Sequence, residues 1–161
     1  MLTIETGSVL SQAFTLPSTP ASVAAARQWA RQILDHWQLS QLHDSSAVLV
    51  SELLTNAIQH ADTGRTPIKL RLIYTSATLR IEVRDLDITD LPNRRMPLLD
   101  EETGRGLLIV DNYADRWSVQ VSDAGKTVWC ELDISPPDEA DGPYSSKANS
   151  SKSQLPDQES S

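Results

Sequence analysis

The sequence predicts an α/β (α+β) fold of two layers, a mixed, mostly antiparallel sheet covered on one face by about three helices. Apolar residues recur at the helical period in two segments, 18–37 and 44–58. Between residues 68 and 134 they alternate with polar residues in short stretches that are typical of strands. Because those stretches come in pairs joined by turn sequences, we expect antiparallel hairpins with the helices packed on one side.

The first helix is expected to begin around residues 18–22 and to end near Trp37. The sequence Ser18-Thr19-Pro20 is typical of a helix start. The apolar residues at the helical period are Val23, Ala26, Ala30, Ile33, Leu34 and Trp37. Phe14–Leu16, ahead of Pro17, predicts a short strand at the sheet edge, whereas the first ten residues show no clear period.

The second helix is expected to be capped by Asp44 or Ser45 and closed by Asp62-Thr63-Gly64. Two alternating stretches follow and predict a strand hairpin that turns at Thr75-Ser76-Ala77. The strand residues expected to face the core are Ile68, Leu70, Leu72, Leu79, Ile81 and Val83.

Residues 86–103 show no sustained period and are long for a connection, which is typical of a lid. A third helix is expected to start after Gly104-Arg105-Gly106 and to run toward Tyr113. Trp117, Val119 and Val121 then predict a strand. It turns at 123–125 and pairs with a strand over 128–134.

One domain is expected over residues 11–134, with an N-terminal extension at 1–10 and a disordered, acidic and Ser-rich tail at 135–161. The 22 acidic residues outnumber the 14 basic ones, and no basic stretch offers a footprint for nucleic acid. Neither a secretion leader nor an apolar run of about 20 residues is visible, so we expect a cytoplasmic protein without membrane contact.

The single cysteine, Cys130, has no partner for a disulfide and no neighbour at metal-ligand spacing. A small apolar residue within a strand is the favoured interpretation, and a reactive thiol is the alternative.

The second helix carries the first candidate site. Glu52, Asn56 and His60 are spaced four apart, so their side chains follow one stripe of the helix. An ordinary solvated face has the same spacing. However, an Asn carbonyl is an oxygen ligand suited to Mg²⁺, and a neighbouring Glu can orient or deprotonate a hydroxyl group.

Other candidate residues lie at element ends. Asp85 ends a strand, where its carboxylate could accept a hydrogen bond from an exocyclic amine, or could simply form a turn. Gly104 and Gly106 open a helix and would let the backbone approach a phosphate. Thr127 could point its hydroxyl toward the same pocket as Asp85, or could be an ordinary strand residue. No P-loop and no full dinucleotide-binding motif is present.

Four stretches, in this order, resemble the anti-sigma-factor serine kinases of the RsbW type, within the histidine-kinase-like (GHKL) ATPases with the Bergerat-type ATP-binding fold. The resemblance covers about residues 11–134. The stretches are Val50-Ser-Glu-Leu-Leu-Thr-Asn-Ala-Ile-Gln-His-Ala61, Glu82-Val-Arg-Asp85, Gly104-Arg-Gly-Leu-Leu-Ile-Val110 and Gly125-Lys-Thr-Val-Trp129.

The resemblance implies ATP and Mg²⁺ as cofactors. Asn56 would coordinate Mg²⁺, Glu52 would act as the catalytic base or orient a water molecule, and Asp85 would bind the adenine amine with help from Thr127. His60 would make a supporting contact near the phosphates, or alternatively a capping interaction at the C-terminus of its helix. The phosphates would be cradled by the start of the third helix, comprising Gly104, Arg105, Gly106 and Leu107.

The implied function is that of a serine/threonine protein kinase, which phosphorylates an anti-sigma-factor antagonist of the STAS type, sequesters a sigma factor, or does both. A homodimer could be the active form. Family members commonly continue as Asp-x-Gly-x-Gly, whereas this chain reads Asp85-Leu86-Asp87-Ile88-Thr89. That departure motivates the alternative, an ATP-binding module that sequesters a partner without catalysis.

Overall fold

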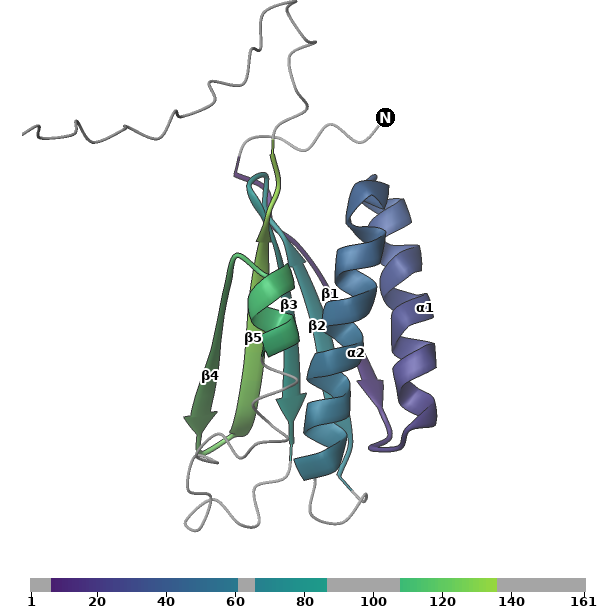
Figure 1. Cartoon of the computed structure of the whole chain (residues 1–161), viewed down its shortest axis with the longest axis vertical. Helices are drawn as coiled ribbons and strands as arrows, with labels where there is room; N and C mark the ends of the chain where they lie inside the picture. The colour runs from purple at the N-terminus through teal and green to yellow at the C-terminus, as the bar shows by residue number, and fades with distance from the viewer. Residues whose placement is uncertain (1–6, 61–65, 87–107, 136–161) are drawn as a thin grey trace, which may run out of the picture.

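The computed structural model describes residues 7–60, 66–86 and 108–135, and their fold is an α+β sandwich of two layers (Figure 1). The elements are β1 (Leu10–Leu16), α1 (Ala21–His36), the 3-10 helix η1 (Ser40–Leu42), α2 (His43–His60), β2 (Ile68–Tyr74), β3 (Thr78–Asp85), β4 (Arg116–Ser122) and β5 (Gly125–Asp133). Residues 108–113 are also helical.

The five strands lie in the order β1-β2-β3-β5-β4, and each neighbouring pair of these described strands is antiparallel. The fold class is confirmed, while the expected mixed character of the sheet is absent from this part of the chain. The reason is the connection between β1 and β2. Helices α1 and α2 form an antiparallel pair that returns the chain to the end where β1 finished, so β2 runs opposite to β1 (Figure 1).

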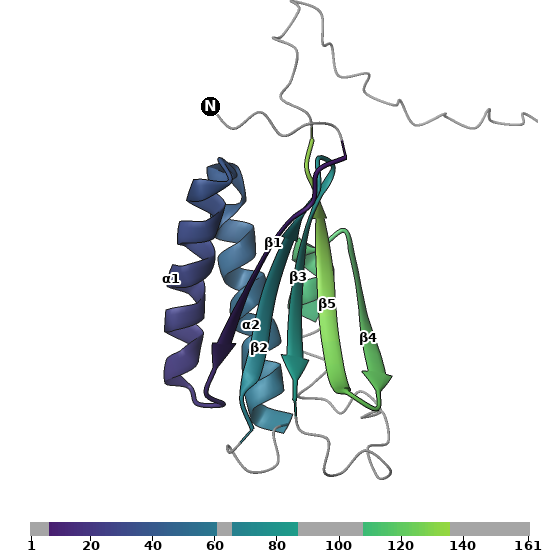
Figure 2. The same ribbon diagram turned by 180° about the vertical axis from the view of Figure 1, so that it is seen from behind.

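The core lies between the sheet and the helices, all of which cover the same face (Figures 1 and 2). The residues of β2 and β3 that point toward the helices and are at most 1% exposed are Ile68, Leu70, Leu72, Leu79, Ile81 and Val83. They meet one apolar stripe from each long helix. The residues of those stripes are Ala26, Ala30 and Leu34 on α1 and Leu49, Val50, Leu53 and Leu54 on α2.

The first helix begins and ends as the sequence predicts. The Ser22 hydroxyl donates a 2.6 Å hydrogen bond to the carbonyl of Pro17, which fixes the entry into α1. At the other end, Gln38 adopts a positive φ of 60°, and the amide of Leu39 bonds back to Leu34. This left-handed residue stops the helix and turns the chain toward η1.

Three element boundaries differ from the sequence prediction, one of them in β5, which starts at Gly125 and not at residue 128. Strand β1 starts at Leu10, ahead of the predicted Phe14, and pairs with β2 along its whole length. Because β1 is an edge strand and most of its residues are exposed, it lacks the alternation that predicts strands. Helix α2 starts at His43 because η1 leads directly into it.

Several sequence predictions fall on residues outside the described ranges. They are the closing turn at Asp62-Thr63-Gly64, the lid at 87–103, the helix start at 104–107 and the tail from Pro136 onward.

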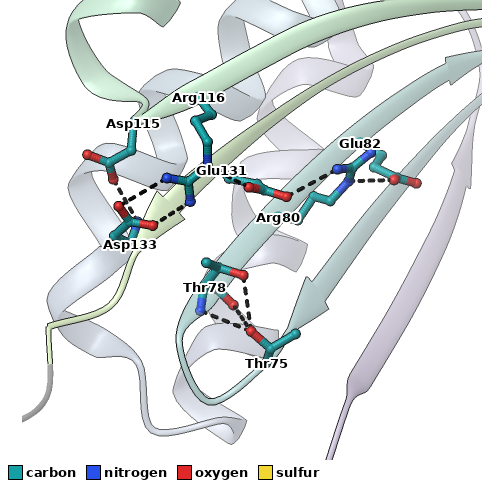
Figure 3. Close-up of polar contacts among 8 residues, drawn as sticks. All are labelled: Thr75, Thr78, Arg80, Glu82, Asp115, Arg116, Glu131 and Asp133. Atoms are coloured by element: carbon teal, nitrogen blue, oxygen red, sulfur yellow. Dashed lines mark hydrogen bonds and ion pairs between the residues drawn. The ribbon is translucent and has the colours of Figure 1, made fainter.

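The sheet face away from the helices carries an alternating row of charges, which we term the ion-pair ladder (Figure 3). It consists of Arg80, Glu82, Glu131, Arg116 and Asp133. Arg80 bonds to Glu82 at 2.8 Å and to Glu131 at 3.1 Å, and its guanidinium lies 3.9 Å above the ring of Trp129. Arg116 bonds to Glu131 at 2.9 Å and also pairs with Asp133.

The ladder changes the proton affinity of its members. Partial burial raises the pKa of Glu131, but hydrogen bonds from Arg116 and Arg80 outweigh burial and bring the pKa below its ordinary value. The hydrogen bond from Arg116 likewise lowers the pKa of Asp133, and the pKa of Arg116 is raised in return. Glu131, Asp133 and Arg116 are therefore charged at neutral pH.

Candidate functional site

Glu52 and Asn56 lie on one flank of α2. Both side chains are half-buried, next to the core residues Leu49 and Leu53. The other flank faces α1, where the hydroxyl of Ser51 accepts a 3.4 Å hydrogen bond from Arg27.

At 100° per residue, Glu52 and Asn56 are about 100° and 140° around the helix axis from Ser51. They therefore occupy the flank opposite α1, on the side where the green helical segment 108–113 lies (Figure 1). Four residues apart on one helix, their Cβ atoms are about 5–6 Å from each other.

Asp85 is the last residue of β3 and is only 5% exposed. Its position alternates with those of Leu79, Ile81 and Val83, so its carboxylate belongs to the helix-covered face. Carboxylates are seldom buried this deeply unless they form hydrogen bonds or ion pairs. Asp85 is therefore a buried carboxylate with an interaction partner, at the end of a core strand.

Gly125 holds the start of β5 against the end of β3. It has a φ of +118°, and a Cβ atom added there would lie 2.1 Å from the carbonyl oxygen of Asp85. Only glycine allows this approach, so Gly125 positions the strand end that carries Asp85. The sequence interpretation treated Gly125 as a turn residue alone. A glycine at the start of a strand often marks a site where another backbone segment approaches closely, so the sequence position of Gly125 could have indicated this contact.

The register of β3 and β5 contradicts the prediction that the Thr127 hydroxyl points to the same side as Asp85. Thr127 pairs with Arg84, and its side chain lies on the face away from the helices. The residue opposite Asp85, and on its face, is Lys126. The sequence already contained the signal, because buried residues alternate at Val128 and Cys130 and leave Thr127 out of phase.

The remaining predicted site residues fall where the structure gives no account of their side chains. Gly104, Arg105, Gly106 and Leu107 precede the described part of the third helix, and His60 is described only as the last residue of α2. Residues 108–113 continue from the glycine-rich segment. This helix is anchored by Val110, which is 1% exposed, whereas Leu108 is 63% exposed.

Three of the elements that carry predicted site residues converge at one end of the domain. The C-terminal part of α2, the end of β3 and the start of β5 all lie at the bottom of Figure 1. The predicted site residues on α2 and β3 are oxygen donors, since Asn56 offers an amide carbonyl and Glu52 and Asp85 offer carboxylates. Such donors suit a hard cation and the amine edge of a purine.

In the part of the chain that the structure describes, no helix is both long enough and apolar enough to cross a membrane.

Comparison with known proteins identifies the family. A model of the histidine kinase-like ATPase domain matches residues 16–132. The chain belongs to this family. A histidine kinase-like ATPase domain binds ATP, and the match spans α1, α2 and strands β2 to β5 apart from the last residue of β5. Of β1 it includes only Leu16.

The chain is also similar to a curated protein. It is 34% identical, over 96 residues, to an uncharacterized protein of Streptomyces coelicolor, SCO4941. The alignment covers 55% of the present chain and 85% of the relative. The chain therefore spans most of the length of this relative.

Proposed function

We propose that the protein is an ATP-dependent serine/threonine kinase that phosphorylates an anti-sigma-factor antagonist of the STAS type, sequesters a sigma factor, or does both. The observation that carries the proposal is the pair Glu52 and Asn56. It lies half-buried on the flank of α2 away from α1, and α2 runs on toward the end of the domain where β3 ends with the buried Asp85. Membership of the histidine kinase-like ATPase family supports ATP as the ligand. Glu52 and Asn56 are the groups that we propose take part in phosphoryl transfer.

The donor set fits Mg²⁺, which prefers oxygen ligands and keeps several waters and phosphate oxygens in its shell. The Asn56 carbonyl would hold the ion, and bound Mg²⁺ neutralises charge on the phosphates during transfer. Glu52, one turn earlier, would accept the proton of the attacking serine hydroxyl. Asp85 would accept a hydrogen bond from the adenine amine and fix the orientation of the nucleotide.

The first test is calorimetric titration with ATP in the presence and absence of Mg²⁺. We expect the wild-type chain to bind MgATP and the Asn56→Ala variant to lose the contribution of Mg²⁺ while remaining folded. Gln59→Ala, an exposed change on the same helix, is the matched control and should bind as the wild type does. Unchanged Mg²⁺-dependent binding by Asn56→Ala would remove Asn56 from the metal site.

The second test is transfer of radiolabelled phosphate to a purified STAS-type antagonist domain. Glu52→Gln keeps the shape of the side chain but cannot accept a proton, so the rate should fall by about 100-fold or more while ATP binding persists. Equal transfer rates for wild type and Glu52→Gln would rule out the proposed base.

The second candidate function is an ATP-binding module that sequesters its partner without phosphorylating it. The sequence Asp85-Leu86-Asp87-Ile88-Thr89, which lacks the glycines usual in relatives, favours it. The two functions predict different products. Stable partner binding in MgATP without phosphoserine supports the module, and phosphoserine that disappears in Glu52→Gln supports the kinase.

A further inference from the structure

Three cations gather on the open face of the sheet, the face turned toward the viewer in Figure 2. They are Lys69 and Arg71 of β2 and Arg84 of β3, and we term them the basic patch. Lys69 and Arg71 are exposed and Arg84 is half-buried. They alternate with core residues of both strands, so all three side chains leave the sheet on the side away from the helices.

The register brings like charges together. Lys69 pairs directly with Arg84, which puts their Cβ atoms about 4.5–5.5 Å apart, and like charges in that position are destabilising. Arg71 is two residues along the same strand, about 7 Å further on. The residue opposite Arg71 is Glu82, but Glu82 is paired with Arg80 in the ion-pair ladder.

None of the three cations has a carboxylate partner among residues 7–60, 66–86 and 108–135. Arg71 donates through Nε to the hydroxyl of Ser11 at 2.9 Å. Arg84 donates through Nη2 to the carbonyl of Ala124 at 3.1 Å, and its buried Nε makes no hydrogen bond there. Lys69 makes no polar contact within these ranges. On the same face, both arginines of the ion-pair ladder are matched by acids.

The basic patch also opposes the charge of the whole chain, which carries a net charge of −8. Adjacent unmatched cations, kept at a cost in stability, supply charge complementarity for an anionic partner and accelerate its encounter. We propose that the basic patch is the docking surface for an acidic segment of a partner protein.

The acidic residues that follow the sheet most closely in the chain do not reach the patch. Arg84 pairs with Thr127, and the eight residues from there to Ser135 span about 27 Å of strand. Asp138, Glu139 and Asp141 follow Ser135 by three to six residues, a reach of at most about 20 Å. They would therefore fall short of the patch.

Nucleic acid also fits less well than an acidic protein segment. Three cations are few beside the roughly 6–10 phosphate contacts typical of nucleic-acid binding, and the net charge of the molecule repels a polyanion.

Docking on this face does not depend on the proposed kinase activity. The basic patch projects from the opposite face of the sheet to Asp85, so an acidic segment should bind equally with and without MgATP. Failure to detect ATP binding or phosphate transfer would not affect the inference about the basic patch. Conversely, failure of the acidic peptide to bind would not affect the proposed kinase activity.

The test uses the full chain and a fluorescent hexaglutamate peptide, with binding followed by anisotropy and mapped by amide chemical shifts. We expect shifts centred on Lys69, Arg71 and Arg84, and affinity that falls with added salt. The double variant Lys69→Glu/Arg84→Glu should bind about tenfold more weakly. The double variant Arg27→Glu/Arg31→Glu, an exposed change of equal charge on α1, is the matched control and should bind as the wild type does.

Three results would overturn the inference. The first is equal affinity for the wild type and the double variant Lys69→Glu/Arg84→Glu. The second is tighter binding of a twelve-residue oligothymidylate than of hexaglutamate, which would make the patch a nucleic-acid site. The third concerns the double variant Asp157→Asn/Glu159→Gln, measured without peptide. If its amide chemical shifts change at Lys69, Arg71 and Arg84, the C-terminal segment of the chain itself occupies the basic patch.

Discussion

Gly125 is the residue on which the position of the Asp85 backbone most depends. A methyl group there meets the Asp85 carbonyl oxygen at 2.1 Å and also requires a strained φ of +118°. We expect Gly125→Ala to lower the free energy of unfolding by about 3 kcal/mol and to weaken ATP binding, since both backbone strain and overpacking contribute.

Gly7→Ala provides the control, because Gly7 also has a positive φ, +109°, but has no atom within 4 Å of the added methyl. Its effect should be limited to about 1 kcal/mol. Urea denaturation of both variants gives the comparison. Equal decreases in the free energy of unfolding of the two variants would show that the close contact with Asp85 does not contribute to the effect of Gly125→Ala.

Cys130 illustrates how burial decides reactivity. The structure confirms the favoured sequence interpretation, a small apolar residue of a strand, because the side chain is fully buried and burial raises the pKa of the thiol to about 12. We predict that the native protein reacts with an aromatic disulfide reagent only as fast as it unfolds. In denaturant the same thiol should react at once, and rapid labelling of the native protein would contradict its burial.

The ion-pair ladder makes the sheet sensitive to acid. Glu131 and Asp133 have pKa values below their ordinary 4.5 and 3.8, so the folded state binds protons less readily than the unfolded chain. The stability they contribute is fully present above those ordinary values and is lost as the pH falls through the lowered ones. Urea midpoints measured from about pH 6 to pH 3 should therefore fall steeply at the acid end.

Arg116→Gln removes the hydrogen bonds that lower both pKa values, so its urea midpoint should depend less on pH over this range. Arg31→Gln, on α1, removes an equal charge far from the ladder and should keep the slope of the wild type. Identical slopes for the two variants would show that the ladder does not set the acid sensitivity.

The elements differ in how well the sequence predicts them, and burial explains the difference. Strands β2 and β3 have one face in the core, so their residues alternate, and their hairpin was predicted with its turn. Strand β1 has a mostly exposed edge position, and Ser11 and Gln12 carry no pattern from which a strand could be inferred. The wholly antiparallel pairing depends on how two helices pack, which local sequence does not encode.

The site residues show the same division. Glu52 and Asn56 could be proposed from their helical spacing together with the chemistry of their oxygen atoms, because both lie on one element. The contact between Gly125 and Asp85 joins residues 40 positions apart in the chain, and strand pairing creates it. The Thr127 side chain was predicted to point to the same side as Asp85. The alternation of apolar residues in its own strand already indicates the opposite face, so the sequence contained the information needed to predict its orientation.

For the molecule as a whole, stability should be graded across the sheet. Strands β2, β3 and β5 have neighbours on both sides, whereas β1 and β4 each have one free edge in the described sheet. We predict that amide hydrogen exchange is slowest in β3 and fastest in β1 and β4. Uniform protection over all five strands would instead indicate a single cooperative unit with covered edges.

The insertion of α1 and α2 between β1 and β2 has a consequence for the order in which the protein assembles during translation. About 50 residues separate Leu16 from Ile68, so β1 leaves the ribosome about 3 to 10 s before the strand with which it pairs. The helical pair can form in that interval, because its contacts are local in sequence. The first strand synthesised therefore joins the sheet only after its partner hairpin exists, and until then its uncharged edge needs protection from other nascent chains.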